Sequence, residues 1–168
     1  MSRLMISSDL HLGHANICKF RPFKSAEEHH EILFNNLATN IKKRDSLLLL
    51  GDIAFDEYWL KRLDEIKCIK KTLILGNHDT EKVNIKVICN HYDEVHSLYS
   101  KRNNWFSHCP IHIDQFRGKE LNIHGHLHGN HVEDVYGYYN DSNYFNACVE
   151  HTEYKPISYS EIIESLNN

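Results

Sequence analysis

The chain has 168 residues, of which 41% are hydrophobic and 25% charged, and its net charge is −4. This length can bury a core without help from disulfides or a partner, so residues 1–168 are treated as a single domain. The negative charge argues against a protein that grips long nucleic acid through a strong basic surface, although a small or single-stranded substrate is compatible with it.

Targeting and membrane signals are weak in this sequence. The five cysteines are scattered and none forms a C-x-x-C pair, which indicates free thiols in a reducing compartment. The N-terminus has too few apolar residues for a signal peptide, and no apolar run approaches the length of a transmembrane helix. We therefore expect a cytoplasmic protein with no membrane partner, and the oligomeric state is unknown at this stage.

Short apolar runs predict strands, and five of them end in Asp, Asn or His. These runs, each with the polar residues that follow it, are 4–6 with Asp9 and His11, 47–50 with Asp52, 70–75 with Asn77 and His78, 104–107 with His108, and 120–123 with His124, His126 and His128. Uninterrupted apolar runs are typical of strands buried on both faces in α/β proteins. Ligands bind beyond the carboxyl ends of such strands.

Capping signals predict the helices. Ser25-x-x-Glu28 and Ser158-x-x-Glu161 are capping boxes, Asp56 is interpreted as an N-cap rather than a ligand, and a short helix is expected from Thr80. From residue 95 to residue 149 strand signals dominate, including 95–99 and 144–149, so this half is predicted to be more antiparallel.

Residues 129–143 are predicted to form a long loop that contains Tyr136, Tyr138 and Tyr139. A loop of this length in a compact domain is usually a functional lid or is mobile. The tyrosines could stack on a nucleobase or cover core, and the second interpretation is preferred.

Asp9 and His11 are two residues apart, so in an extended chain they would point the same way and could chelate one ion. The alternative is an Asx turn beside an unrelated histidine. The other strand ends add carboxylate, amide and imidazole groups, which are ligands for divalent metals. The sequence therefore predicts a metal centre where the strands end.

The five blocks Asp9-x-His11, Gly51-Asp52, Gly76-Asn77-His78-Asp79, Ser107-His108 and Gly125-His126-x-His128 resemble the signature of the calcineurin-like metallophosphoesterase family. All five are present in the family's order. The stretch from His11 to Ile17, followed by Arg21-Pro22-Phe23, is similar to a small bacterial and bacteriophage branch. The resemblance implies an α/β fold of four layers, with two mixed β-sheets packed face to face and helices outside.

The resemblance also implies two metal ions. Asp9, His11 and His128 would hold the first ion, Asn77, His108 and His126 the second, and Asp52 would bridge both. Ligands of this kind, without thiolate, suit manganese, iron, zinc or nickel better than calcium or magnesium, and manganese is the first expectation. Glu150 stands where many members of the family have aspartate.

Phosphoester hydrolysis adds negative charge to an anionic centre, and two ions roughly 3.5–4 Å apart can screen it while turning a bridging water into hydroxide. The leaving alkoxide needs a proton, for which His78 is predicted, because it lies beside Asn77 and is not needed as a ligand. Asp79 would set the tautomer of His78. The alternative for His78 is a structural role.

Candidate contacts to the substrate phosphate are His14, Asn16 and Arg21, and a plain loop role is the alternative for His14. His124 is expected to support the ligands from behind. The remaining histidines, including His29 and His30, are interpreted as surface or loop residues.

The predicted function is a metal-dependent phosphoric ester hydrolase, foremost a phosphodiesterase acting on a small, nucleotide-like phosphoester. One alternative is a phosphatase or nuclease acting on nucleic-acid ends, against which the low basicity counts. The other is a non-catalytic, protein-binding scaffold of the same fold. Scaffold relatives lose ligands or the catalytic histidine, whereas this chain keeps the full set.

Overall fold

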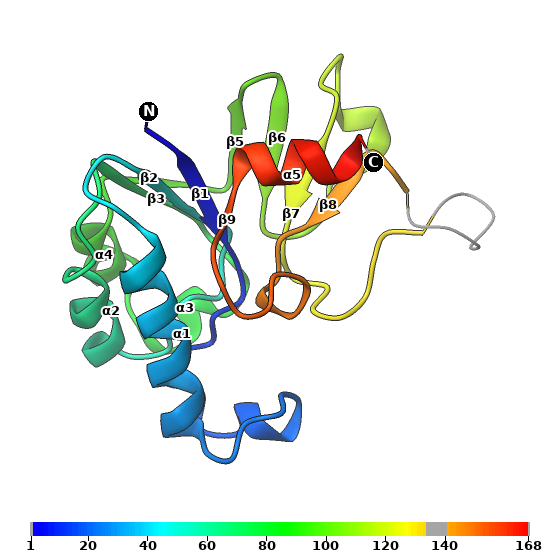
Figure 1. Cartoon of the computed structure of the whole chain (residues 1–168). Helices are drawn as coiled ribbons and strands as arrows, with labels where there is room; N and C mark the ends of the chain where they lie inside the picture. The colour runs from blue at the N-terminus through cyan, green and yellow to red at the C-terminus, as the bar shows by residue number, and fades with distance from the viewer. Residues whose placement is uncertain (1, 134–140, 168) are drawn as a thin grey trace.

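The computed structural model describes residues 2–133 and 141–167, and these form two mixed β-sheets with helices (Figure 1). The predicted lid tyrosines Tyr136, Tyr138 and Tyr139 lie outside the described residues. The strands are β1 (Leu4–Ser7), β2 (Ser46–Leu49), β3 (Lys70–Ile74), β4 (Glu94–His96), β5 (Leu98–Lys101), β6 (Asn104–Ser107), β7 (Asn122–His124), β8 (Tyr144–Asn146) and β9 (Ile157–Ser158).

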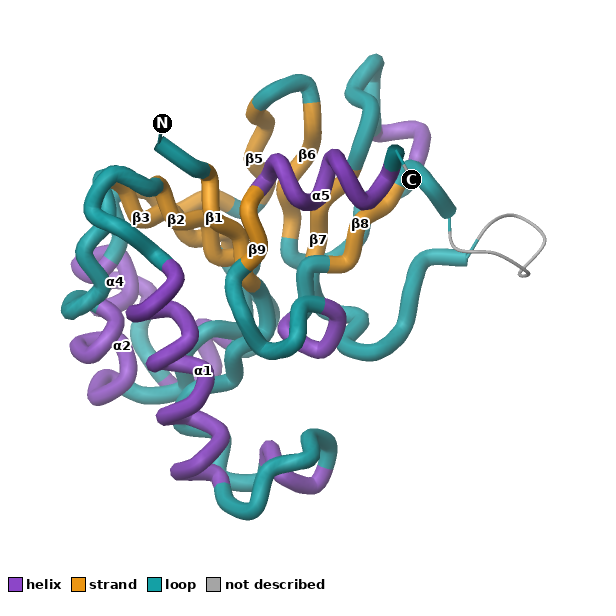
Figure 2. The backbone as a smooth tube through the Cα atoms, in the orientation of Figure 1, coloured by secondary structure: helices purple, strands orange, loops and turns teal. Residues whose placement is uncertain are grey.

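The first sheet has the order β4-β3-β2-β1-β9, and only β9 is antiparallel to its neighbour. The second sheet has the order β5-β6-β7-β8, and β6, β7 and β8 are parallel. Figure 2 shows the two groups of strands beside each other. The prediction of a more antiparallel second half holds only for the β5–β6 pair, because β6, β7 and β8 are parallel.

The strand predicted at 95–99 is in fact two strands that belong to different sheets. β4 pairs with β3 in the first sheet, and after Ser97 the chain enters β5 and pairs with β6 in the second. The two pieces are joined without a turn signal, which is why the sequence pattern reads as one element.

The helices are α1 (Ala26–Asn40), α2 (Glu57–Leu63), α3 (Asp79–Lys82), α4 (Ile85–Ile88) and α5 (Tyr159–Leu166). Ser158 and Glu161 form the predicted capping box, and Asp56 caps α2 through the Trp59 N–H, as predicted. Ser25 caps α1, but the Glu28 carboxylate accepts from Lys24 rather than closing the box. The helix predicted from Thr80 begins at Asp79 and is broken after Lys82.

The four consecutive leucines around β2 are buried because the sheet is covered on both faces. Leu47 and Leu49 belong to the cluster that packs against α1, α2 and α4, whereas Leu48 and Leu50 pack with Phe106 and Ile123 of the second sheet. Alternate side chains of a strand point to opposite faces, so each face of β2 receives two leucines. The two sheets thus pack face to face through a shared apolar layer.

Helices α1, α2 and α4 cover the outer face of the first sheet (Figure 1). Helix α5 differs, because Ile162 belongs to the cluster between the sheets. On the second sheet, Phe116 of the loop after β6 contacts the ring of Tyr144, and its carbonyl accepts the Trp105 indole N–H.

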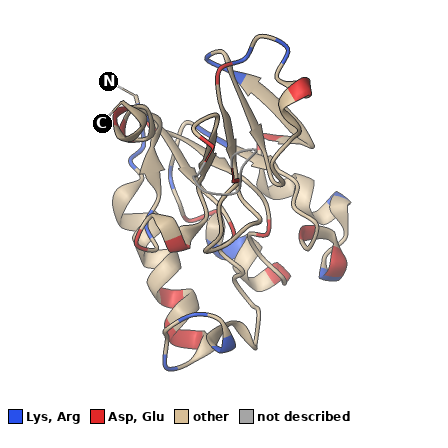
Figure 3. Ribbon diagram, turned by 90° about the vertical axis from the view of Figure 1, so that its right-hand side faces the viewer, with Lys and Arg blue, Asp and Glu red and all other residues tan. Residues whose placement is uncertain are grey.

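All five cysteines are free thiols. Among the described residues no helix is both long and apolar enough to cross a membrane. Figure 3 shows basic and acidic residues distributed over both the helical and the strand-rich parts of the molecule.

Candidate metal centre

Loops from the carboxyl ends of the parallel strands bring the predicted ligands to one edge of the two sheets. The Asp9 N–H donates to the Gly51 carbonyl at 3.0 Å, and the Gly125 N–H donates to the His108 carbonyl at 2.8 Å. Gly125 also approaches Ser8 and Asp9 so closely that a Cβ atom would overlap both side chains. Neighbouring loops are therefore held in contact where the ligands lie.

Five of the seven predicted ligands have a left-handed backbone. The φ angles are 56° at Asp9, 50° at His11, 55° at Asp52, 70° at His126 and 49° at His128. Each such residue costs of order 1 kcal/mol or more, and such conformations gather at functional sites. The expectation that Asp9 and His11 converge from an extended chain is wrong in its geometry, because the two side chains meet by way of left-handed turns.

The first group consists of Asp9, His11 and His128, whose ligand atoms lie within 4.8 Å of one another. The His11 Nε2 is 3.7 Å and the His128 Nε2 3.9 Å from the Asp9 Oδ1. Asp9 is 0% and His11 6% exposed, yet the Asp9 Oδ1 and both His11 ring nitrogens have no hydrogen-bond partner in the described structure. Buried polar atoms without a partner are costly, and a metal ion is one group that these atoms could bind.

The second group centres on His108. Its Nε2 lies 2.9 Å from the Asn77 Oδ1 and 3.2 Å from the His126 Nδ1. Its Nδ1 lies 2.8 Å from the Leu50 carbonyl oxygen, a partner that fixes the ring and leaves Nε2 facing the cluster. The group also contains Cys109, which the sequence prediction did not include. The Cys109 Sγ lies within 4.8 Å of ligand nitrogens of His108 and His126.

Asp52 lies between the two groups. Its Oδ2 is 3.4 Å from the His108 Nε2 and 4.0 Å from the His11 Nε2, while its Oδ1 accepts the His78 N–H at 2.8 Å. The seven predicted ligands are thus brought together, with Asp52 between the two groups.

Both carboxyl groups are held in the charged form. Burial is the largest influence and raises each pKa, but the nearby His11 ring and the Ser8 hydroxyl at Asp9, and the nearby His108 ring at Asp52, lower both pKa values below the ordinary range. Burial lowers the pKa of His108, but its contacts with Asp52 and Asp9 raise it overall. The two carboxylates are therefore in the deprotonated form in which they could bind a cation.

The donor set fits divalent metal ions. Carboxylate and amide oxygens with imidazole nitrogens suit borderline ions such as zinc, iron, nickel and manganese. The unpartnered atoms of Asp9 and His11 lie where such an ion would replace missing hydrogen bonds. The residues present therefore fit the metals that the family resemblance implies.

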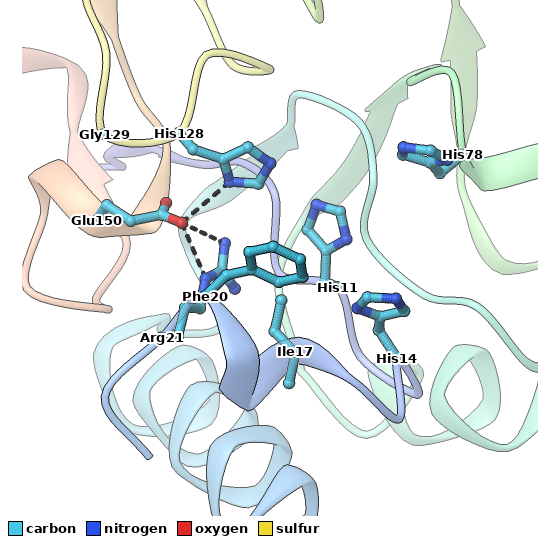
Figure 4. A pocket seen from close by; sticks show the side chains of 9 residues that line it. All are labelled: His11, His14, Ile17, Phe20, Arg21, His78, His128, Gly129 and Glu150. Carbon is cyan, nitrogen blue, oxygen red and sulfur yellow. Dashed lines mark hydrogen bonds and ion pairs between the residues drawn. The ribbon is translucent and has the colours of Figure 1, made fainter.

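Arg21 was predicted to contact the substrate phosphate, and the structure corrects this. Arg21 is buried, and its guanidinium donates to the Asp9 carbonyl at 2.7 Å and to the Glu150 Oε1 at 2.8–2.9 Å. The same Glu150 oxygen lies 3.0 Å from the His128 Nδ1, as Figure 4 shows. Because its donors are already used, Arg21 orients Asp9 and His128 instead of binding substrate.

His29 and His30 were interpreted as surface or loop residues, but both are buried. The His29 Nε2 lies 2.9 Å from an Arg21 nitrogen, the Nδ1 atoms of the two histidines lie 2.9 Å apart, and the His30 Nε2 accepts the Gly13 N–H at 3.2 Å. Burial, and secondarily the Arg21 charge, lowers the pKa of His29 to about 3. Both rings are therefore neutral, and they connect α1 to the loop that carries His11 and Gly13.

Asp79 does not contact the His78 ring, so the prediction that it sets the tautomer is wrong. Its carboxylate accepts the backbone N–H groups of Asp52, Ile53 and Gly76 at 3.0, 2.9 and 2.7 Å. The His78 Nδ1 instead lies 2.8 Å from Glu81, one turn further along. Asp79 therefore braces two ligand loops, and Glu81 orients His78.

A cavity of about 440 Å³ lies beside the first group and is lined in part by His11, His14, His78 and Phe20 (Figure 4). The His11 and His78 ring centroids are 6.0 Å apart, which places His78 beside the cluster. His14 lies in the cavity wall, and its contact with substrate phosphate stays a prediction. Phe20 was not predicted and is 78% exposed.

Asn16, predicted to contact phosphate, is exposed and is not among the residues that line this cavity. Its carbonyl accepts the Lys19 N–H at 3.0 Å in the turn that begins the 3-10 helix Ile17–Lys19. His124 is fully buried, with its Nδ1 2.7 Å from the Gly125 carbonyl oxygen, in agreement with a supporting position.

The residues that sequence reasoning missed gave weak signals or none. Glu150 stood out as a departure from the family pattern, but its partner Arg21 is 129 positions away. The pairing of His29 with Arg21 and the approach of Cys109 to His126 likewise join separate segments, so nothing in the local spacing reveals them.

Comparison with known proteins gives relatives without an assigned activity. No family model matches the chain. The uncharacterized protein MJ1445 of Methanocaldococcus jannaschii is 30% identical over 172 residues, which cover 99% of this chain and 92% of the relative. The crystal structure of the protein of unknown function AQ665 from Aquifex aeolicus matches with a TM-score of 0.74 and 27% identity, covering 98% of this chain and 99% of that chain.

A third match is to the crystal structure of the phosphopantetheinyl hydrolase PptH from Mycobacterium tuberculosis. Its TM-score is 0.41 with 17% identity, over 63% of this chain and 41% of that chain. A likeness this weak carries no conclusion about the activity of this chain.

Proposed function

The chain belongs to the same family as the Methanocaldococcus jannaschii protein MJ1445, and we propose that it is a dinuclear-metal-dependent phosphodiesterase acting on a small, nucleotide-like phosphoester. The two mixed sheets that pack face to face agree with the metallophosphoesterase fold, which is part of this proposal. The five motif blocks of this sequence supply every side chain that the proposed metal centre needs.

One observation carries the proposal. Seven separated ligand residues meet at one edge of the sheets, and two carboxylates and several imidazoles face each other with the Asp9 Oδ1 and the His11 Nε2 unpartnered. Burying such a set without a cation would be costly. The division into two groups, with Asp52 between them, supports a dinuclear rather than a single site.

When bound, two divalent ions would stabilise the charge that develops on the phosphoryl group and would lower the pKa of an attacking water. Asp9, His11 and His128 would hold one ion, Asn77, His108 and His126 the other, and Asp52 both.

His78 is the proposed general acid. It lies in the cavity wall beside His11 and is half-buried, so its ring reaches the space that a substrate would occupy. Its Nδ1 is held by Glu81, which leaves Nε2 to give a proton to the leaving oxygen.

The cavity supports a substrate with an apolar, planar group. Phe20 and Ile17 lie in its wall close to His14 and His128, so that apolar surface adjoins the proposed first metal site. A nucleobase or another aromatic group could stack on the exposed Phe20 ring while the phosphodiester faces the metals.

The proposal is tested by hydrolysis of bis-p-nitrophenyl phosphate and p-nitrophenyl phosphate with added manganese. We expect turnover of the diester that requires manganese, falls by about 10²–10⁴ in His78→Ala, and falls strongly in Asn77→Ala. His112→Ala is the matched control, because His112 is exposed and lies outside the cluster. A folded wild-type protein that binds no metal ion would refute the proposal.

A further inference from the structure

The second ligand group contains a thiol that the dinuclear proposal does not use. The Sγ of Cys109 and ligand nitrogens of His108 and His126 all lie within 4.8 Å of one another. These three residues come from two different loops, one after β6 and one after β7. The cluster is therefore made by the tertiary fold and not by local spacing alone.

Cys109 lies where a ligand can be both near the metal and open to solvent. It follows His108 directly, and His108 is 3% exposed whereas Cys109 is exposed. Cys109 also lines a second cavity of about 380 Å³ together with Asn77 and His108, two of the residues proposed to hold the second ion.

The other thiol near the centre has a different environment. Cys148 is buried, and its Sγ donates to the Asp9 Oδ2 at 3.1 Å. The Cys148 Sγ is occupied by this hydrogen bond, and Cys148 belongs to none of the ligand groups among the described residues. Cys109, whose Sγ faces two ligand histidines, is therefore the thiol placed to act as a ligand.

We propose that Cys109 is a thiolate ligand of the second metal site and that this site takes a thiophilic divalent ion, such as zinc, iron or cobalt. The inference rests on the proposed dinuclear centre and revises its metal preference. Manganese, expected for a site without thiolate, favours carboxylate and water ligands, whereas thiolate selects softer ions. On binding, the Sγ–metal bond forms and the thiol proton passes to solvent.

Cobalt titration of the metal-free, full-length protein tests the inference, because cobalt bound to thiolate has a sulfur-to-metal charge-transfer band in the near ultraviolet. The visible ligand-field bands count bound cobalt independently. Wild type, Cys109→Ala and Cys89→Ala are compared, since Cys89 is also exposed and belongs to none of the ligand groups in the described residues.

We expect the charge-transfer band in wild type and Cys89→Ala and its loss in Cys109→Ala, which should still bind cobalt. Zinc affinity of the second site should fall at least about tenfold in Cys109→Ala, while manganese affinity changes little, since even outer-shell partners are worth that much. Cobalt binding by wild type without the band, or a band that survives in Cys109→Ala, would overturn the thiolate inference alone. A wild-type protein that binds no cobalt would overturn both this inference and the proposed metal centre.

Discussion

Replacing Asp79 tests whether this carboxylate stabilises the loops that carry the ligands or sets the tautomer of His78. Its two oxygens accept three backbone N–H groups, from Asp52, Ile53 and Gly76, and the side chain is 3% exposed. Alanine would leave three buried donors without partners, at about 1–3 kcal/mol each. Because water entering the vacated space recovers part of this, we expect Asp79→Ala to lower the free energy of unfolding by about 3–5 kcal/mol.

Asp79→Asn provides a graded comparison. Its amide keeps the shape, but only one of its two polar atoms can accept, so one side of the brace is lost. We expect a decrease of about 1–2 kcal/mol in the free energy of unfolding. Urea unfolding of wild type and both variants in metal-free buffer gives these values, and equal m-values would show that the comparison is sound.

Glu81→Gln is the matched control, because it removes the carboxylate that does contact His78. The two side chains are 40% and 50% exposed, so stability should change by less than about 1 kcal/mol, while diester turnover falls. The bracing role is refuted if Asp79→Ala unfolds within about 0.5 kcal/mol of wild type. An Asp79→Asn protein of unchanged stability, with turnover as low as His78→Ala, would restore the original prediction for Asp79.

Three further predictions concern the substrate, pH and metal. Phe20→Ala should lower kcat/KM about fivefold or more for thymidine 5′-p-nitrophenyl phosphate but not for methyl p-nitrophenyl phosphate, and an equal decrease for both would exclude stacking. His29 has a native pKa of about 3 against an ordinary 6.5, so the unfolded chain binds the extra proton as the pH falls and stability decreases. Between roughly pH 8 and pH 5, His29 should lower the free energy of unfolding of the wild type by about 2 kcal/mol. Urea unfolding at both pH values should show that this decrease is absent in His29→Gln. Chelation should lower Tm by about 5–10 °C and added manganese should restore it, whereas a Tm indifferent to both would argue against metal binding.

The positions of strands and caps could be predicted because their signals are local. The leucine run of β2 fills both faces of one strand, and Asp56 and Ser158 cap helices through N–H groups three residues away. The convergence of Asp9 and Asp52 followed from parallel strands, whose carboxyl ends share one edge of a sheet. Their metal-binding role stays a prediction.

Strand direction in the second sheet could not be predicted, since parallel and antiparallel partners select the same apolar side chains. The crossing between the two sheets at Ser97 was not predicted because no turn signal separates β4 from β5. Residue types and their order along the chain predicted the seven candidate ligands, but they did not predict which strands are parallel.

Only the tertiary structure decided what each of those groups contacts. Arg21 was predicted to contact substrate, but its guanidinium donates to Glu150, which lies far along the chain, and Arg21 therefore supports the ligands instead. Asp79 braces backbone loops, and Cys109 enters a ligand group through the approach of the loop that carries His126. Hydrogen bonds and metal ligation depend on distances of a few ångströms between remote segments, and the packing of the two sheets sets those distances.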